Sequence, residues 1–378
     1  MSCSVLRLSD LIGQSRAVTV LRSAIGRDRV AHAYLFSGPE GVGKSTAARA
    51  FAQTLNCERL HERSPVEACG ECRSCLQVAR GNHPDVRFVS PEPDERGRQR
   101  TEISIDQVRF LIHDVSLKRV VGRYKVYVID PADRMNQYSA NALLKVVEEP
   151  PGESVLVLVS SHPAALLPTL LSRCQKVAFQ LAGRASIQEH LVSLGTDPAA
   201  AASLAALSGG RVGWAIRASQ RPEVLAARQK LLDLCAGLET QPIGASLRIA
   251  EQIKLHGVQL AQARKQEEEV GAAAEDEDES PRSGASGGVT DRALRADLPW
   301  CLDVMASWYR DRVAAANGGM IFNTDYADAI RRNLRGHDGA QAEGAIEAIL
   351  AARQQIPRNA NIDLLLESLA IRLVSGSE

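Results

Sequence analysis

The sequence predicts an α/β domain built on a parallel sheet, followed by a part of the chain that is entirely helical. The first 180 residues alternate short apolar runs with helical patterns, which is typical of strands joined by crossover helices. A glycine-rich loop joins the first apolar run to an alanine-rich helix. Strand-like runs stop after about residue 182. We therefore expect a sheet domain over residues 1–182, a small helical domain over 183–220 and a helical C-terminal domain over 221–378.

Five apolar runs are the expected strands of the sheet. They cover residues 34–37, 86–90, 125–130, 154–160 and 176–180. Helices are expected between them. Residues 44–56 contain no helix breaker, and apolar residues at 105, 108, 111, 112 and 115 have helical spacing. Residues 139–149 are helical in pattern and are followed by two prolines and a glycine. The sheet should therefore have helices on both faces.

The rest of the chain is helical in pattern, with one interruption. Residues 185–217 form a small helical unit broken at Gly209-Gly210, and a continuous helical pattern covers 222–260. Residues about 265–290 are acidic and then rich in Gly and Ser, so they cannot bury apolar area. We expect a disordered loop there; an acidic segment that mimics DNA is the less favoured interpretation. Helical pattern resumes over 293–374.

The composition excludes several classes of protein. Lys plus Arg (45) equals Asp plus Glu (45), so charge alone predicts neither strong nucleic-acid binding nor attraction to anionic membranes. No apolar stretch approaches the roughly 18 to 20 residues that span a bilayer. The N-terminus lacks the apolar region of a signal peptide. We therefore expect a cytoplasmic chain without membrane contact, in which cysteines stay reduced.

The glycine-rich loop is a complete G-x-x-x-x-G-K-S phosphate-binding motif. Its glycines let backbone N–H groups turn inward around a triphosphate, while the lysine reaches the β- and γ-phosphates and the serine holds Mg²⁺. The following helix adds its N-terminal dipole. A glycine-rich turn without a ligand is the alternative. The residues expected to bind ATP and Mg²⁺ are Gly38, Gly41, Gly43, Lys44, Ser45, Thr46 and, downstream, Asp130.

Asp130 ends a buried strand and fits the carboxylate that holds the metal through water. Hydrolysis normally needs a second carboxylate just beyond it, which positions the attacking water. That position is Pro131, and the next acid, Asp133, lies three residues after Asp130. The chain is therefore expected to bind nucleotide and to hydrolyse it weakly or not at all.

Four cysteines follow the phosphate loop with the spacing C-x11-C-x2-C-x2-C: Cys57, Cys69, Cys72 and Cys75. Four thiolates at such spacing are typical of a structural zinc site, which leaves no open position for catalysis. A redox C-x-x-C motif explains two of the four, and four merely buried thiols are the remaining alternative. The other cysteines are scattered along the chain. We expect one Zn²⁺ in a module over about residues 57–75.

A Ser-Arg-Cys segment covers residues 172–174, at what should be the edge of the sheet. An arginine at a subunit edge can reach the γ-phosphate bound by a neighbouring subunit and stabilise charge in phosphoryl transfer. Arg173 is therefore a candidate arginine finger acting in trans. A surface arginine paired with an acid is the alternative, and spacing alone does not separate the two.

Together these segments resemble the delta-prime family of clamp-loader subunits of bacterial DNA polymerase III, a branch of the AAA+ family. The resemblance covers about residues 8–216; the rest matches only in being helical, as the family's oligomerisation (collar) domain is. The segments that carry it are residues 11–15, 31–45, the four-cysteine module, 83–85, 128–136, 140–151 and 172–174.

The resemblance implies a role in DNA replication. Family members sit in five-subunit rings with gamma/tau and delta subunits, as part of the DNA-directed DNA polymerase III holoenzyme, a nucleotidyltransferase complex. These rings load the sliding clamp onto primed DNA. The resemblance favours Arg173 as the finger that completes the ATP site of an adjacent motor subunit. It also implies an AAA+ sheet domain, a helical lid over 183–220 and the collar over 221–378.

Two other functions stay open. The gamma/tau-type motor ATPase of the same complex also carries a phosphate loop, a four-cysteine module and Ser-Arg-Cys, but Pro131 argues against it. A stand-alone DNA-binding zinc protein is the third, and the neutral charge argues against that.

Besides Pro131 after Asp130, the sequence departs from the family pattern in two places. Many delta-prime chains lack a working phosphate loop, whereas Lys44 and Ser45 are present here. Trp214 falls where active relatives carry the sensor-2 arginine, although Arg211 lies close by. Ser160 or Ser161 should be the polar sensor-1 residue, and the sequence does not choose between them.

Overall fold

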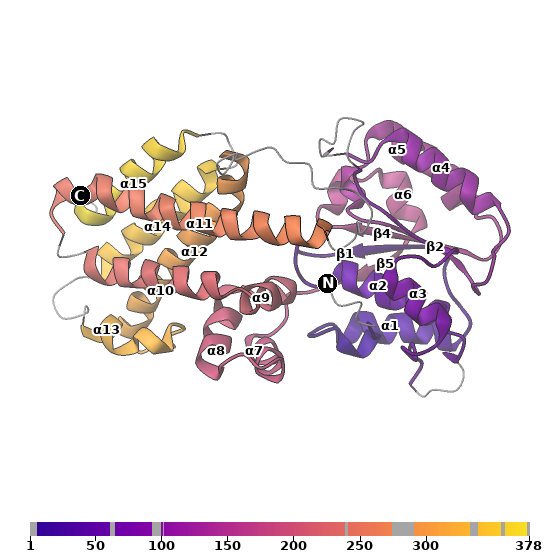
Figure 1. Cartoon of the computed structure of the whole chain (residues 1–378), viewed down its shortest axis with the longest axis horizontal. Helices are drawn as coiled ribbons and strands as arrows, with labels where there is room; N and C mark the ends of the chain where they lie inside the picture. The colour runs from indigo at the N-terminus through magenta and orange to yellow at the C-terminus, as the bar shows by residue number, and fades with distance from the viewer. Residues whose placement is uncertain are drawn as a thin grey trace. The chain divides into compact units, whose positions relative to one another are not determined.

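The computed structural model describes residues 6–60, 65–92, 100, 102–238, 241–273, 291–332, 339–356 and 360–375. The chain divides into two compact units (Figure 1). Unit 1 comprises Met1–Ile187 and Gly210–Trp214, and unit 2 comprises Gln188–Gly209 and Ala215–Glu378. The residues expected to form a separate lid domain, 183–220, are thus shared between the two units.

Unit 1 is built on a five-stranded sheet in which all neighbouring strands are parallel, as predicted. The strand order is β2-β3-β4-β1-β5. Because β1 lies between β4 and β5, the carboxyl ends of strands distant in sequence meet beside the phosphate loop. The strands are β1 (Ala33–Ser37), β2 (Val86–Val89), β3 (Lys125–Ile129), β4 (Ser154–Ser160) and β5 (Gln175–Ala178).

Helices cover both faces of this sheet, and Figure 1 shows α4 and α5 on one side and α1, α2 and α3 on the other. Alternation along the strands supplies the two cores. In β1, Tyr34 and Phe36 pack toward α1 and α2, whereas Ala33 and Leu35 pack with residues of α4 and α5. The helices are α1 (Ser15–Gly26), α2 (Lys44–Leu55), α3 (Arg73–Arg80), α4 (Ile105–Ser116), α5 (Gln137–Glu148) and α6 (Pro168–Arg173).

Among the described residues of unit 1, short turns of 3-10 helix are η1 (Leu8–Asp10), η3 (Ala132–Arg134) and η4 (Pro163–Ala165). The capping signals explain where the longer helices begin. The hydroxyl of Ser104 accepts the N–H of Gln107 while the Gln107 side chain accepts the N–H of Ser104, a capping box that starts α4. The side chain of Asn136 caps α5 through Ser139.

The described residues of unit 2 contain helices and no strand. The helices between the sheet and the long C-terminal helices are α7 (Arg184–Ser193), which begins in unit 1, α8 (Pro198–Leu207), α9 (Val212–Ser219) and α10 (Pro222–Gly237). After them come η6 (Ile243–Ala245), α11 (Ser246–Ala273), α12 (Asp291–Ala316), η7 (Thr324–Tyr326), α13 (Ala327–Arg332), α14 (Gly339–Gln355) and α15 (Ile362–Ser375).

A buried polar network ties α10 to the turn before α13. The guanidinium of Arg228, 3% exposed, donates two hydrogen bonds to the Asp325 carboxylate at 2.6 and 2.8 Å, and one to Asn323. Asn323 in turn donates to the fully buried Asp311 of α12. Because each charge has a partner, this network can be buried without an unpaired ion.

The expected disordered loop over 265–290 is wrong in its first part, since α11 continues to Ala273. Glu, Gln, Lys and Ala are good helix formers, so a polar composition does not end a helix that is already nucleated. Residues 274–290 lie outside the described part of the chain. Within the described residues, none of the helices combines the length and apolarity needed to cross a bilayer.

Candidate functional site

The phosphate loop lies between β1 and α2, as the sequence predicts. β1 ends at Ser37 and α2 begins at Lys44, so the glycines fall in the connecting turn. A Cβ at Gly38 would collide with the carbonyl oxygen of Phe179, which explains why glycine is needed there. Gly43 precedes α2 with φ of 99°, a left-handed conformation that glycine adopts without penalty. The N-terminus of α2, with its free N–H groups, opens onto this turn, which is the geometry of an anion site.

Lys44 is folded back into the loop and is only 6% exposed. Its ammonium donates hydrogen bonds to the carbonyl oxygens of Gly38 and Pro39 at 2.8 and 2.7 Å. A third hydrogen bond, of 3.0 Å, goes to the hydroxyl of Ser161. Burial lowers the pKa of Lys44, and the nearby carboxylate of Asp130 is the largest opposing effect. The ammonium is thus already positioned inside the turn that would surround a phosphate.

Asp130 follows β3 directly and faces the first residues of α2. The hydroxyl of Ser45 donates a hydrogen bond to its carboxylate. Burial raises the pKa of Asp130, although this hydrogen bond and the positive charges of Lys44 and Arg49 act in the opposite direction. A serine hydroxyl beside a carboxylate is the oxygen pair that Mg²⁺ prefers. The structure therefore brings together the two side chains that the sequence assigns to the metal of a nucleotide complex.

The position after Asp130 has no acid, because Pro131 occupies it. Asp133 lies in η3, and one of its carboxylate oxygens accepts the backbone N–H of Ser161 at 3.2 Å. The other oxygen lies 3.9 Å from Nδ1 of His162. Asp133 thus ties the segment after β3 to the end of β4. The sequence identified Asp133 as an acid near the site but not as this link.

The structure distinguishes Ser160 from Ser161 as the polar residue at the sensor-1 position, which the sequence left open. Ser160 is fully buried, and its hydroxyl accepts the backbone N–H of His162 at 3.0 Å. Ser161 directs its hydroxyl to the ammonium of Lys44. The geometry therefore favours Ser161 as the polar residue that faces the phosphate loop.

A short segment from beyond the sheet also packs on the phosphate loop. The backbone N–H of Gly213 donates to the carbonyl of Gly41 at 2.8 Å. The Cβ of Arg211 lies 3.3 Å from where a Cβ at Gly41 would stand. The family resemblance predicts Trp214 at the sensor-2 position. Arg211 and Gly213 of the same segment contact the phosphate loop at Gly41.

Arg173 is the last residue of α6 and is 40% exposed at its side chain. Its guanidinium lies 2.9 Å from the Glu148 carboxylate and donates to the carbonyl of Thr169 at 3.1 Å. Within this chain Arg173 is therefore a surface arginine paired with an acid. A role in trans concerns a neighbouring subunit and stays a prediction.

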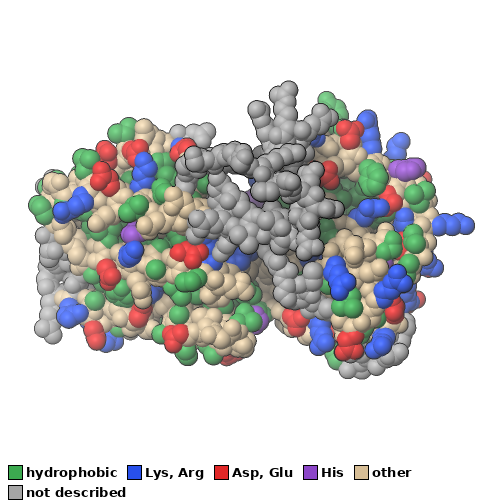
Figure 2. Space-filling view, in the orientation of Figure 1, with side chains coloured by type: hydrophobic (Ala, Val, Ile, Leu, Met, Phe, Trp, Pro, Cys, Tyr) green, Lys and Arg blue, Asp and Glu red, His purple; other side chains and the backbone are tan. Residues whose placement is uncertain are grey.

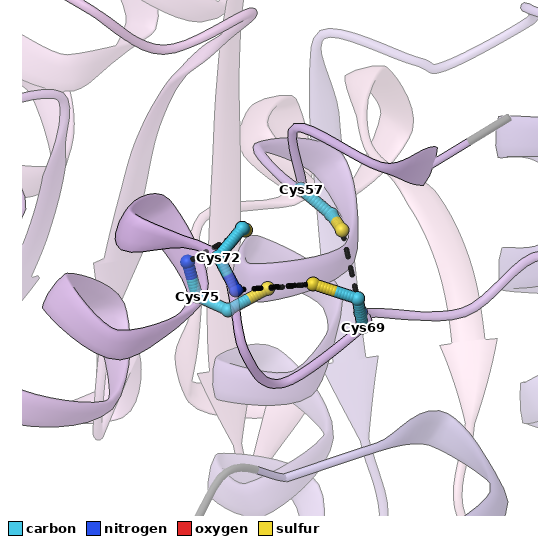
Figure 3. Close-up of side chains that lie close together, drawn as sticks. All are labelled: Cys57, Cys69, Cys72 and Cys75. Carbon is cyan, nitrogen blue, oxygen red and sulfur yellow. Dashed lines mark hydrogen bonds between the residues drawn. The ribbon is translucent and has the colours of Figure 1, made fainter. Parts of the chain in front are cut away.

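The four cysteines converge on one buried site (Figure 3). Cys57 follows α2, Cys72 caps α3 and Cys75 lies in its first turn, so two helices carry three of the four thiols to the same point. All four are at most 7% exposed, and their sulfur atoms lie within 4.8 Å of one another. Zn–S bonds of about 2.3 Å in a tetrahedron put sulfurs about 3.8 Å apart, so the set fits.

Backbone N–H groups point at these sulfurs. Cys69 Sγ accepts from Glu71 and Cys72 at 3.4 and 3.3 Å, and Cys72 Sγ accepts from Cys75 at 3.4 Å. Cys57 Sγ accepts the N–H of Cys69 at 3.3 Å. Hydrogen bonds of this kind favour the thiolate and fix the orientation of a metal ligand.

The thiols differ in how readily they ionise. Burial raises the pKa of Cys69, but the N–H groups of Glu71 and Cys72 outweigh it and lower the pKa to about 7. Burial raises the pKa of Cys57 and of Cys75. One thiolate is thus available near neutral pH, and a bound cation is what would ionise the others. No disulfide joins the four. The donor set could hold a metal ion and has no open position.

Comparison with known proteins agrees with these features. The family described as DNA polymerase III, delta subunit matches residues 13–182. The chain is 42% identical to DNA polymerase III subunit delta' of Pseudomonas aeruginosa over 55% of this chain and 63% of that protein. It is 27% identical to the delta' subunit of Bacillus subtilis over 96% of this chain and 97% of that protein. The alignment thus spans slightly less than two thirds of the first relative and nearly all of the second.

Other relatives are subunits of the same polymerase. The tau/gamma subunit of Haemophilus influenzae is 38% identical over 50% of this chain and 26% of that protein. Among solved structures, a gamma-subunit-related protein of Thermotoga maritima covers 95% of this chain and 99% of its own with a TM-score of 0.37 and 16% identity. The clamp loader delta protein of B. subtilis covers 94% and 99% with a TM-score of 0.34 and 11% identity.

Proposed function

We propose that this chain, which is similar to delta' subunits of bacterial DNA polymerase III, is the delta-prime subunit of a replicative clamp loader. It helps to load a sliding clamp onto primed DNA, in a cytoplasmic hetero-oligomeric ring with gamma/tau and delta subunits. The similarity to a delta' subunit over 96% of the chain carries this proposal. Helices α10 to α15 of unit 2 supply the collar through which the ring assembles, and α7 to α9 supply the lid.

The nucleotide site supports a subunit that binds ATP–Mg²⁺ and hydrolyses it slowly. Gly38, Gly41 and Gly43 shape the turn, and Lys44 with the backbone N–H groups of Ser45 and Thr46 would hold the phosphates. Ser45 and Asp130 would hold the magnesium ion. Pro131 offers no water-activating carboxylate, and Asp133 is engaged with the backbone of Ser161.

The four cysteines bind one structural Zn²⁺ in this proposal. Metal analysis of freshly purified protein should find about one zinc per chain, and a preparation that never contains zinc would contradict it. Zinc would supply charge that keeps all four thiolates ionised, and no catalytic step passes through it.

Arg173 supplies the arginine finger to the ATP site of the neighbouring motor subunit. The test is Arg173→Ala in the reconstituted complex. We expect assembly to be unchanged and ATP hydrolysis to fall, since a finger accounts for roughly 10³-fold or more at the site that it completes. The matched control is Arg109→Ala, which removes another exposed arginine paired with an acid, Asp106. Equal hydrolysis by the two variant complexes would exclude the finger role.

The gamma/tau-type motor is the second candidate, favoured by the 38% identity to a tau/gamma subunit. Steady ATP hydrolysis by the purified chain at a motor's rate, abolished by Lys44→Ala, would support the motor and contradict the delta-prime assignment.

A further inference from the structure

The loop between α4 and β3 is exposed in its side chains and tightly held in its backbone. Leu117, Val120 and Val121 are 50%, 71% and 59% exposed, which is unusual for large apolar residues. Yet the backbone N–H groups of Val120, Val121 and Gly122 all donate to the carboxylate of Asp85, at 2.8, 2.8 and 2.6 Å. Three hydrogen bonds to one buried carboxylate fix the loop far more strongly than its exposure suggests.

A second side chain holds the end of the same loop. Asn56 accepts the backbone N–H of Tyr124 at 2.9 Å and donates to the Tyr124 carbonyl at 3.1 Å. A Cβ at Gly122 would stand 2.8 Å from the Asn56 side-chain oxygen, so only glycine fits there. Asn56 is itself only 4% exposed. Residues 120–124 thus rest on two buried polar side chains, Asp85 and Asn56.

Both Asn56 and Asp85 are linked to the four-cysteine centre, one by the chain and one by hydrogen bonds. Asn56 immediately precedes Cys57. Asp85 is linked through His83: the Asp85 N–H donates to Nδ1 of His83 at 3.1 Å, and Nε2 of His83 lies 2.9 Å from the hydroxyl of Ser74. Because Nδ1 accepts, the ring proton is on Nε2 and is donated to Ser74.

Ser74 lies between two of the cysteines, Cys72 and Cys75, in the first turn of α3. It is 2% exposed, and its N–H is held by the Glu58 carboxylate at 3.1 Å. Displacement of this turn would therefore move Ser74, and through His83 it would move the Asp85 carboxylate. Ser74, His83 and Asp85 are each at most 3% exposed, so these contacts lie out of reach of bulk water.

We propose that the metal-bound cysteine centre sets the shape of the surface loop 120–124, through Asn56 on one side and through Ser74, His83 and Asp85 on the other. The inference rests on the zinc site of the proposed function. Asn56, Ser74, His83 and Asp85 are positioning residues in it. Loss of the metal then changes the presentation of Val120 and Val121, which lie outside the metal module in sequence.

Hydrogen exchange of the full-length chain tests this inference. In zinc-loaded protein the amides of residues 120–122 should be protected, and removal of zinc by a chelator should speed their exchange by about tenfold or more, since each hydrogen bond to a charged group is lost or weakened. Amides in α12 serve as an internal reference and should keep their rates. Unchanged exchange at 120–122 after zinc removal would overturn the inference.

Two variants break the link without touching a cysteine. Ser74→Ala removes the contact to His83, and Asp85→Asn replaces the carboxylate; both should bind one zinc and expose the 120–122 amides faster. Ser116→Ala is the control, because the Ser116 hydroxyl donates to the His113 carbonyl within its own helix. If Asp85→Asn loosens the loop while zinc removal and Ser74→Ala do not, Asp85 holds the loop alone and the role of the metal is excluded.

Metal analysis reports separately on the zinc site. A chain that binds no zinc overturns the zinc site and this inference together. If the chain binds zinc but the exchange rates of the 120–122 amides change neither on zinc removal nor in Ser74→Ala, the inference is overturned. The zinc site itself is then unaffected.

Discussion

The two ends of helix α2 carry sites of opposite character. At its N-terminus the phosphate loop gathers charged groups that satisfy one another: Lys44 bonds to two carbonyls and to Ser161, and Ser45 bonds to Asp130. Beyond its C-terminus the cysteine centre gathers four thiols whose neighbours are one another and backbone N–H groups. The first site is internally paired, whereas in the second burial raises the pKa of Cys57 and of Cys75, so that a bound cation would be needed to ionise them.

From this difference we expect a ligand of the phosphate loop to serve function and a ligand of the cysteine centre to serve folding. A paired phosphate loop keeps its shape with or without nucleotide, because no buried charge is left unpaired. The cysteine centre joins the end of α2 to the first turn of α3, so its collapse would disturb both helices. We therefore expect variants at the metal end to reduce stability and variants at the phosphate end to reduce nucleotide binding.

The largest expected effect is that of Cys57→Ser on stability. Loss of one ligand of a closed four-thiolate site should cost about 4 kcal/mol or more in the free energy of unfolding, together with the bound zinc. Chemical denaturation of the full chain with parallel metal analysis measures both. Cys174→Ser is the control of matched burial, 8% exposed against 7%, and should cost only about 1 to 2 kcal/mol with zinc retained.

Equal losses of stability in the two serine variants would mean that Cys57 acts as a buried thiol and not as a metal ligand. The contrast between the two ends of α2 would then disappear.

At the phosphate end, Lys44→Ala should weaken binding of ATP–Mg²⁺ by about 10- to 100-fold, because it removes a charge-assisted hydrogen bond to phosphate. The free energy of unfolding should change by less than about 1 kcal/mol, since the variant also removes a desolvated charge. Fluorescent-nucleotide titration and denaturation measure the two quantities. Lys145→Ala, on the exposed surface of α5, should change neither.

If Lys44→Ala instead lowered the free energy of unfolding strongly and left nucleotide affinity unchanged, Lys44 would serve stability and not nucleotide binding.

The sequence was informative where a local pattern determines the structure. The five strands lie within two residues of their predicted ends, because continuous apolar runs between turn residues leave few other positions for a buried strand. Lys44, Ser45 and Asp130 meet as predicted because the motif fixes the turn and parallel strands end at one edge. The spacing of the cysteines likewise predicted their convergence.

Contacts between residues on strands distant in sequence could not be predicted from the sequence. Ser161 reaches Lys44, and Asp133 reaches Ser161, only because β4 lies between β3 and β1 in the sheet. That order depends on the whole fold and not on a local motif. In the same way, Asp85 stood in a segment of family resemblance without any signal that its carboxylate would hold three amides 35 to 37 residues away.

The smallest expected effect is a pH dependence of the free energy of unfolding, which arises from His83 near the cysteine centre. Burial lowers the pKa of His83, and the nearby carboxylates of Asp85 and Glu58 only partly oppose this. A histidine whose pKa is depressed in the folded state binds its proton more readily when unfolded, so stability falls as pH drops below about 6.5. The fall continues until the folded-state pKa is reached. Between pH 7 and 5.5 the contribution of His83 to the free energy of unfolding should therefore decrease.

His83→Gln tests this, because glutamine retains an acceptor for Asp85 and a donor for Ser74 but does not titrate. Its free energy of unfolding, measured by denaturation with zinc present, should fall less between pH 7 and 5.5 than that of the wild type. His113→Gln, on the exposed face of α4, should keep the wild-type dependence. Protonation of zinc ligands contributes equally to all three proteins, so the difference between them isolates His83. Identical pH profiles for wild type and His83→Gln would show that the folded chain does not keep this ring neutral, which would contradict the acceptance of the Asp85 N–H by Nδ1.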